Sequence, residues 1–126
     1  MNFDDFVRNL SISELGKTKI EPEEFIKLFK EKKAILLDIR EDFEKEVVKF
    51  PFAIEIPINK LPDNLEKLPK DKIIVCACPN AYRSVFATNY LNYKGFNAKN
   101  LTGGLSKLFS EHLNGNKAKA ILDVLS

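Results

Sequence analysis

The chain has 126 residues, of which 44% are hydrophobic and 30% charged, and its formal net charge is +2. This length suits one domain with a single hydrophobic core, and the nearly balanced charge argues against a nucleic-acid-binding or lipid-binding protein. The longest apolar runs have about six residues, far short of the roughly 20 that a membrane span requires, and the N-terminal segment lacks the apolar stretch of a signal peptide, so we expect a cytoplasmic protein.

The first third of the chain predicts two helices and a strand. A helical repeat of apolar residues predicts a helix over residues 2–10, and residues 11–19 are expected to form a connector. Pro22 and the acidic residues beside it mark the start of a second helix, which runs to about residue 33. The apolar run at residues 34–39 is typical of a buried parallel strand.

The middle third contains two further strands. Residues 41–48 are expected to form a short helix, and the alternating run at 53–58 predicts a strand near the sheet edge, where Pro57 is tolerated. A short helix is expected over residues 61–71. Residues 72–77 form the most apolar strand of the chain.

The last third continues the alternation of helix and strand. Residues 82–93 are expected to form a helix that ends at Gly95, a glycine in a typical C-cap position. A last strand is predicted at residues 97–101, a helix begins near residue 105, and a terminal helix covers residues 116–125.

This order of elements predicts an α/β fold in a single domain over residues 1–126. Alternating strands and helices indicate an open, mostly parallel sheet with helices on both faces. In such sheets the reactive crevice lies beyond the carboxyl ends of the strands. Cys78 follows directly after the strand at residues 72–77, at such an end.

The loop between this strand and the next helix has the sequence CPNAYRS. Backbone N–H groups and the positive end of a helix dipole favour an anion at such a position. Arg83 adds a fixed positive charge and a pair of donors suited to oxyanions. We therefore expect Cys78 to exist partly as a thiolate and to act as a nucleophile.

The alternative interpretation is a buried structural cysteine, and this alternative fits Cys76 inside the apolar strand. A redox or metal pair formed by Cys76 and Cys78 is not favoured. A metal site needs further ligands, and the single histidine, His112, is distant in sequence. We expect neither a metal nor an organic cofactor.

The pattern Cys-x-x-x-x-Arg-Ser after an apolar strand resembles the active-site loop of the rhodanese domain. Three further segments resemble that family in the same order: LLDIRE at 36–41, FPFAIEIPI at 50–58 and GFNAKNLTGGL at 95–105. The resemblance covers roughly residues 20–110, so the N-terminal helix 2–10 and the C-terminal helix 116–125 are additions. It implies a rhodanese-like domain built around a five-stranded sheet.

The length of the loop favours sulfur transfer over phosphate chemistry. Four residues separate Cys78 from Arg83, which in the family accompanies sulfur transfer, whereas the related phosphatases and arsenate reductases have five. The resemblance implies a sulfurtransferase of the thiosulfate:cyanide type. Cys78 would take a sulfur atom from thiosulfate, polysulfide or another sulfane donor, and pass it as a persulfide to cyanide or to a thiol or protein acceptor. The alternative is a non-catalytic binding module or a persulfide relay to a docked protein.

The resemblance also assigns site residues. Cys78 and Arg83 are the catalytic pair. The remaining residues of the substrate-binding and persulfide-binding loop are Pro79, Asn80, Ala81, Tyr82 and Ser84. Ala81 stands where the family usually has glycine, a residue that accepts positive φ, and Pro79 removes one N–H donor from the loop.

Two strand-end residues and one serine have structural roles in this prediction. Asp38 and Arg40 are expected to support the loop, either as an ion pair or through bonds from Asp38 to loop amides. The alternative for this pair is a satisfied buried carboxylate beside a solvated arginine. Ser84 is expected to cap the following helix in preference to binding the loop.

Overall fold

A computed structural model describes residues 2–125 and contains a five-stranded sheet in the order β1-β5-β4-β2-β3. All four strand pairings are parallel. The strands are β1 (Lys19–Ile20), β2 (Ala34–Asp38), β3 (Ile54–Glu55), β4 (Ile73–Ala77) and β5 (Asn97–Leu101). The expected α/β class with a parallel sheet is therefore confirmed.

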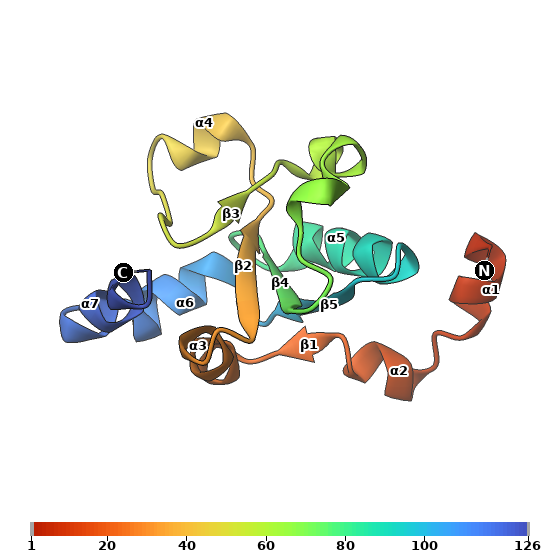
Figure 1. Ribbon diagram of the computed structural model, residues 1–126, viewed down its shortest axis with the longest axis horizontal. Helices are drawn as coiled ribbons and strands as arrows, with labels where there is room; N and C mark the ends of the chain where they lie inside the picture. The colour runs from red at the N-terminus through yellow and green to blue at the C-terminus, as the bar shows by residue number, and fades with distance from the viewer. Residues whose placement is uncertain (1, 126) are drawn as a thin grey trace.

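Helices cover both faces of the sheet (Figure 1). One face packs against α3 (Pro22–Lys30), α6 (Gly104–His112) and α7 (Asn116–Asp123), and the other against α5 (Tyr82–Tyr93) and the 3₁₀ helix η1 (Ile58–Asp63). The shorter helices are α1 (Phe3–Arg8), α2 (Ile12–Gly16), α4 (Asp42–Lys45) and η2 (Leu65–Lys67). Within residues 2–125, no helix is both long enough and apolar enough to cross a membrane.

The strand residues alternate between two hydrophobic clusters, one on each face. Val75 and Ala77 of β4 point toward α3 and α6, whereas Cys76 points toward α5 together with Ala87 and Leu91. Cys78, which continues this alternation just after the strand, belongs to the cluster beneath α5. The alternation thus decides on which side of the sheet the thiol lies.

The predicted connector at residues 11–19 is wrong, because this segment contains α2 and the first residue of β1. The Ser11 side chain accepts a hydrogen bond from Glu14 N and caps α2. β1 has two residues and gains its strand character from pairing with β5, so it shows no periodicity of its own.

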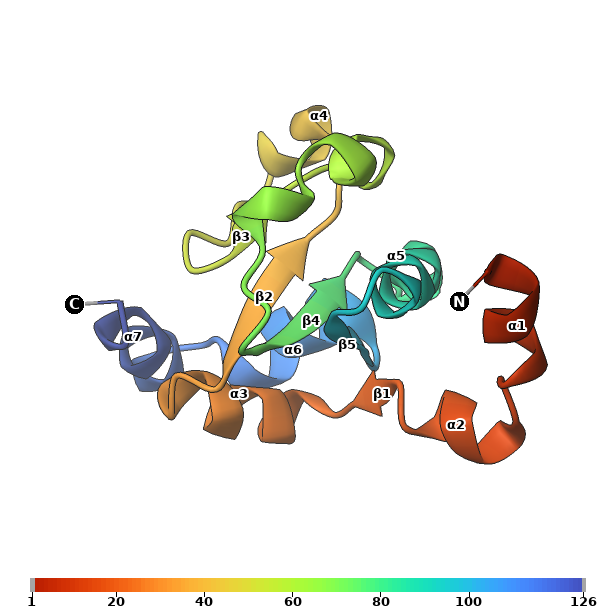
Figure 2. The same ribbon diagram turned by 45° about the vertical axis from the view of Figure 1, so that its right-hand side comes forward.

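The N-terminal and C-terminal helices lie at opposite ends of the molecule (Figures 1 and 2).

The predicted short helix at residues 61–71 is also wrong. The chain instead forms η1 and η2, and η1 begins earlier, directly after Pro57. Pro62 lies inside η1. Proline lacks the N–H that an α-helix would use, so tighter turns take the place of the α-helix.

Glycine at position 104 allows the start of α6 to touch the cysteine loop. Leu105 N donates to the carbonyl oxygen of Cys78 at 2.9 Å, and Ser106 N to that of Pro79 at 3.3 Å. A Cβ atom on Gly104 would lie 2.4 Å from each of these two carbonyl oxygens, and the residue has a φ of +66°. The loop and α6 can therefore approach this closely only with glycine at this position.

We expect Gly104→Ala to lower the free energy of unfolding by at least about 2 kcal/mol, because it adds a steric clash to a left-handed backbone. Urea denaturation measures this change. The control is Gly16→Ala, since an added Cβ there meets no atom within 4 Å and should change stability by no more than about 1 kcal/mol. Equal stability of Gly104→Ala and the wild type would contradict the close approach.

Candidate active site

The sulfur atom of Cys78 lies at the amino end of α5. Cys78 is fully buried, and its Sγ accepts a hydrogen bond from Ser84 N at 3.4 Å. Ser84 is the third residue of α5, and the N-cap residue Ala81 makes no side-chain cap. The sulfur therefore occupies the place of the usual capping oxygen, where the helix dipole favours a negative charge.

The prediction that Ser84 caps the helix is wrong, because Ser84 lies within the first turn of α5. Its buried hydroxyl instead contacts the sulfur of Cys78: Cys78 Sγ donates to Ser84 Oγ at 3.5 Å. Ser84 Oγ in turn donates to Asn100 Oδ1 on β5. Ser84 thus contacts Cys78 of the loop, and Asn100 is a contact that was not predicted from the sequence.

Arg83 is held by Glu44 of α4 in a two-pronged ion pair. Arg83 Nη1 lies 2.9 Å from Glu44 Oε2, and Nη2 lies 2.7 Å from Oε1. The hydrogen bonds from Arg83 lower the pKa of Glu44 to about 2 from 4.5, and the same bonds raise the pKa of Arg83. Glu44 was not among the residues predicted from the sequence. Its place in a capping box with Glu41 was a local signal for α4 but not for the pairing with Arg83.

Asp38 and Arg40 form a buried ion pair, one of the predicted alternatives. Arg40 Nη2 lies 2.8 Å from Asp38 Oδ2 and also donates to the carbonyl oxygen of Val48 at 2.9 Å. Arg40 is 5% exposed, so the interpretation as a solvated arginine is wrong. The pair braces the segment that carries Glu44, rather than bonding the amides of the cysteine loop.

The rest of the loop ranges from half-buried to exposed. Ala81 adopts the left-handed conformation, with φ of +73°, which is the conformation that the usual glycine accepts without strain. Pro79 is half-buried, Asn80 is exposed, and Tyr82 is 66% exposed. The structure therefore brings Cys78, Arg83 and Ser84 together and leaves Asn80 and Tyr82 on the rim.

Cys76 has the structural environment that the sequence predicted. It is fully buried in the middle of the sheet, and this burial raises the pKa of its thiol to about 12. Both cysteines are free. Cys76 is thus a neutral core residue at physiological pH, which separates it chemically from Cys78 at the helix end.

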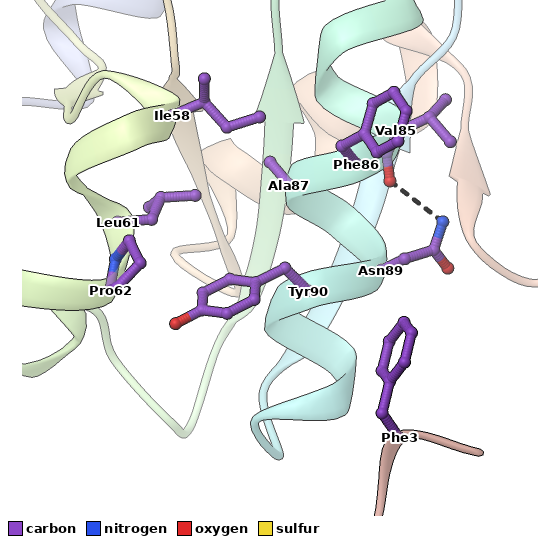
Figure 3. Close-up of a pocket in the computed structure, with 9 residues that line it drawn as sticks. All are labelled: Phe3, Ile58, Leu61, Pro62, Val85, Phe86, Ala87, Asn89 and Tyr90. Carbon is purple, nitrogen blue, oxygen red and sulfur yellow. Dashed lines mark hydrogen bonds between the residues drawn. The ribbon is translucent and has the colours of Figure 1, made fainter. Parts of the chain in front are cut away.

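Two pockets lie near this site. A small one of about 170 Å³ adjoins the loop at Pro79, and its other lining residues are Arg40, Val48, Phe50, Leu105, Ser106 and Phe109. A larger apolar groove of about 430 Å³ runs between η1 and α5, with Phe3 of α1 at one end (Figure 3). The groove is lined by α5 residues from Val85 onward, so the small pocket is the one that touches the cysteine loop.

We expect the pH dependence of stability to report the Glu44–Arg83 pair. Because the folded-state pKa of Glu44 is lowered to about 2, the pair stabilises the fold above pH 4.5 and loses this effect as the pH falls toward 2. Glu44→Gln should cost about 1–2 kcal/mol at pH 7, since the pair is partly exposed, and should lack this acid-dependent part. Urea midpoints at a series of pH values measure the difference.

The matched control for this prediction is Glu46→Gln, which changes an exposed carboxylate two residues away. It should leave the pH profile of the wild type unchanged. Parallel pH profiles for the wild type and Glu44→Gln would show that the pair contributes nothing to folding.

We expect Ala81→Gly to raise the free energy of unfolding by about 1 kcal/mol, because it relieves left-handed strain at the loop. Chemical denaturation measures the gain. Ala118→Gly, in the regular helix α7, should instead lose about 1 kcal/mol. A loss of stability in both variants would mean that Ala81 is not strained.

Comparison with known proteins identifies the family. Residues 21–111 match the profile described as a rhodanese-like domain. The Bacillus subtilis protein YtwF, whose name calls it a candidate sulfurtransferase, is 33% identical over 99 residues, covering 79% of this chain and 87% of the relative. A tRNA uridine(34) hydroxylase of Pelagibacter ubique is 33% identical over 102 residues, and the match covers 76% of this chain and 34% of that relative.

Solved structures agree with this assignment. A rhodanese-related protein from Thermoplasma volcanium has a TM-score of 0.67 and 28% identity, covering 74% of this chain and 91% of that one. The reduced Bacillus anthracis CoADR-RHD has a TM-score of 0.66 and 30% identity, covering 73% of this chain and 16% of that one. The profile match spans most of the length of this chain, which therefore belongs to the rhodanese-like domain family.

Proposed function

We propose that this protein is a sulfurtransferase in which Cys78 carries the transferred sulfur as a persulfide. The observation that carries this proposal is the position of Cys78 Sγ, which accepts the Ser84 N–H at the amino end of α5. A sulfur anion formed there meets the positive end of the helix. Relatives named as sulfurtransferases, including one from Allochromatium vinosum that is 33% identical over 72 residues, support the same reaction class.

In the first step, the loop moves to expose Cys78, which is fully buried in the fold. Cys78 then loses its proton to the solvent and attacks the outer sulfur of a sulfane donor such as thiosulfate. The new bond joins Cys78 Sγ to that sulfur, while the sulfur–sulfur bond of thiosulfate breaks and sulfite leaves with the electron pair. Polysulfide would react in the same way, with a shorter polysulfide as the leaving group. The product is a Cys78 persulfide anion, which the N–H groups of the first turn of α5 can stabilise.

In the second step, an acceptor nucleophile attacks the outer sulfur of the persulfide. The electron pair of the sulfur–sulfur bond returns to Cys78, which is again a thiolate. Cyanide as the acceptor would be converted to thiocyanate, and a thiol acceptor would become a persulfide. Both steps transfer sulfur without a metal or an organic cofactor, and the two free cysteines suit a reducing compartment such as the cytoplasm.

Arg83 has a different role in this scheme from the one its charge alone suggests. Both of its Nη atoms face Glu44, which neutralises most of its charge. Its Nε is buried and has no hydrogen-bond partner within the described part of the chain. We infer that Arg83 chiefly anchors α4 to the loop and offers its unpaired Nε–H to an incoming anion.

The pocket beside the loop is small, and its lining includes Pro79 but not Cys78. Its volume of about 170 Å³ is well below the 300–1,000 Å³ typical of pockets for drug-sized ligands. A thiosulfate or short polysulfide ion fits this scale. A binding module without chemistry remains the rival function, and its distinguishing feature would be a Cys78 that takes up no sulfur.

We expect the wild-type protein to gain the mass of one sulfur atom after incubation with thiosulfate or polysulfide, and to lose it on addition of cyanide. Intact-protein mass spectrometry measures both changes. Cys78→Ser should gain none, because a serine hydroxyl cannot form a persulfide under these conditions. Cys76→Ala is the matched control and should load as the wild type does, at a small cost in stability from the cavity that it leaves.

Failure of the folded, reduced wild type to gain sulfur from either donor would contradict the proposal and favour the binding module. Loading that persists in Cys78→Ser but disappears in Cys76→Ala would assign the chemistry to the other cysteine. Loading of the wild type without turnover on cyanide, but with transfer to a protein thiol, would favour the persulfide relay.

A further inference from the structure

A buried chain of hydrogen bonds leads from Cys78 to Asn100. Cys78 Sγ donates to Ser84 Oγ at 3.5 Å, and Ser84 Oγ donates to Asn100 Oδ1. Cys78 and Ser84 are fully buried, and Asn100 is 7% exposed. Asn100 pairs with Cys76 in the register of β4 and β5, so a residue of the neighbouring strand reaches the group that contacts the nucleophile.

The direction of this chain follows from the chemistry of its three members. A carbonyl oxygen accepts hydrogen bonds and donates none, so the single hydroxyl hydrogen of Ser84 goes to Asn100. The hydroxyl then presents its lone pairs to Cys78. It can accept from a thiol in this orientation, but it offers nothing to a thiolate, which needs donors. In this orientation the Ser84 hydroxyl can stabilise only the thiol, so the backbone N–H of Ser84 is the hydrogen-bond donor that this residue offers to a thiolate.

We propose that Asn100 is a positioning residue that competes with Cys78 for the hydroxyl hydrogen of Ser84 and thereby sets how readily the nucleophilic thiolate forms. When Cys78 gives its proton to the buffer, the Ser84 hydroxyl turns from Asn100 to the sulfur. The bond to Asn100 is lost, and a charge-assisted bond to the sulfur anion takes its place. The catalytic consequence of this turn rests on the proposed sulfurtransferase function.

The surroundings of Asn100 make this turn feasible. Asn100 borders a pocket of about 260 Å³, whose lining includes Leu15, Thr18 and Thr88. Water in a pocket of this size can bind the carbonyl oxygen once Ser84 releases it. The turn therefore leaves no buried acceptor without a partner, a cost that would otherwise oppose it.

The other charged and titratable groups around the sulfur lie on three elements. Arg83 of α5 interacts with Cys78 through its charge and is paired with Glu44 of α4, while Cys76 precedes Cys78 on β4. Burial raises the pKa of Cys76 to about 12, so a thiolate that forms well below this pH belongs to Cys78. The ionisation of Cys78 is thus measurable by itself.

The test is a pH titration of the ultraviolet absorbance of the thiolate, made on the full chain, with Cys78→Ser as the blank. Asn100→Leu keeps the approximate size of the side chain but cannot accept a hydrogen bond, so the Ser84 hydroxyl is free to bind the sulfur. We expect the midpoint of thiolate formation to fall by about 1 pH unit. Asn100→Asp keeps the acceptor and adds a negative charge, so its midpoint should rise.

Asn97→Leu changes an exposed asparagine on the same strand and is the matched control, with no expected shift. Asn100→Leu in a Ser84→Ala background should also show no shift, because the hydroxyl that transmits the effect is absent. Opposite shifts in the two Asn100 variants cannot come from a general loss of folding, which would move both in the same direction.

A midpoint in Asn100→Leu that equals or exceeds that of the wild type would overturn the proposal. So would a shift that persists without the Ser84 hydroxyl, because Asn100 would then act on the sulfur by another route. The titration uses no sulfur donor, so it separates this inference from the proposed function. If the protein takes up no sulfur but Asn100→Leu lowers the midpoint of thiolate formation, the result contradicts only the proposed sulfurtransferase function.

Discussion

The hydrogen bond from the backbone N–H of Ser84 to Cys78 Sγ is the contact on which the rest of the site depends. It requires β4 to end at Ala77 and α5 to begin at Tyr82, with a turn short enough to bring the helix end back over the sulfur. Ala81 takes the left-handed conformation at the end of that turn. The sulfur can then replace the missing side-chain cap, and the helix dipole favours its negative form.

Two ion pairs hold the surrounding segments around this contact. The buried ion pair of Asp38 and Arg40 holds the segment that follows β2, and Glu44 of that segment forms an ion pair with Arg83. The charge of Arg83 is largely balanced by that of Glu44, so we expect backbone N–H groups and Ser84 to provide most of the stabilisation of a sulfur anion. Because a hydroxyl has one hydrogen, the contact between Ser84 and Asn100 is the basis of the proposed positioning role of Asn100.

Local patterns predicted the elements whose own residues determine them. The apolar runs of β2 and β4 and the spacing of α5 were sufficient, and the strand end at Ala77 led directly to Cys78. Patterns failed where structure depends on distant partners. β1 is defined by its pairing with β5, and Glu44 meets Arg83 across 39 positions of the chain. Ser84 was assigned to the helix cap because serine is a common capping residue, but α5 begins at Tyr82 and its N-cap position is Ala81.

Peptide mass spectrometry locates the transferred sulfur within the chain. Trypsin cleavage after Lys72 and Arg83 releases a peptide that holds both cysteines, and alkylation of the sulfur-loaded protein followed by fragmentation distinguishes them. We expect the additional sulfur on Cys78 and an unmodified thiol at Cys76, since one sulfur lies at a helix end and the other in the core. The additional sulfur on Cys76, or on neither cysteine, would contradict this expectation.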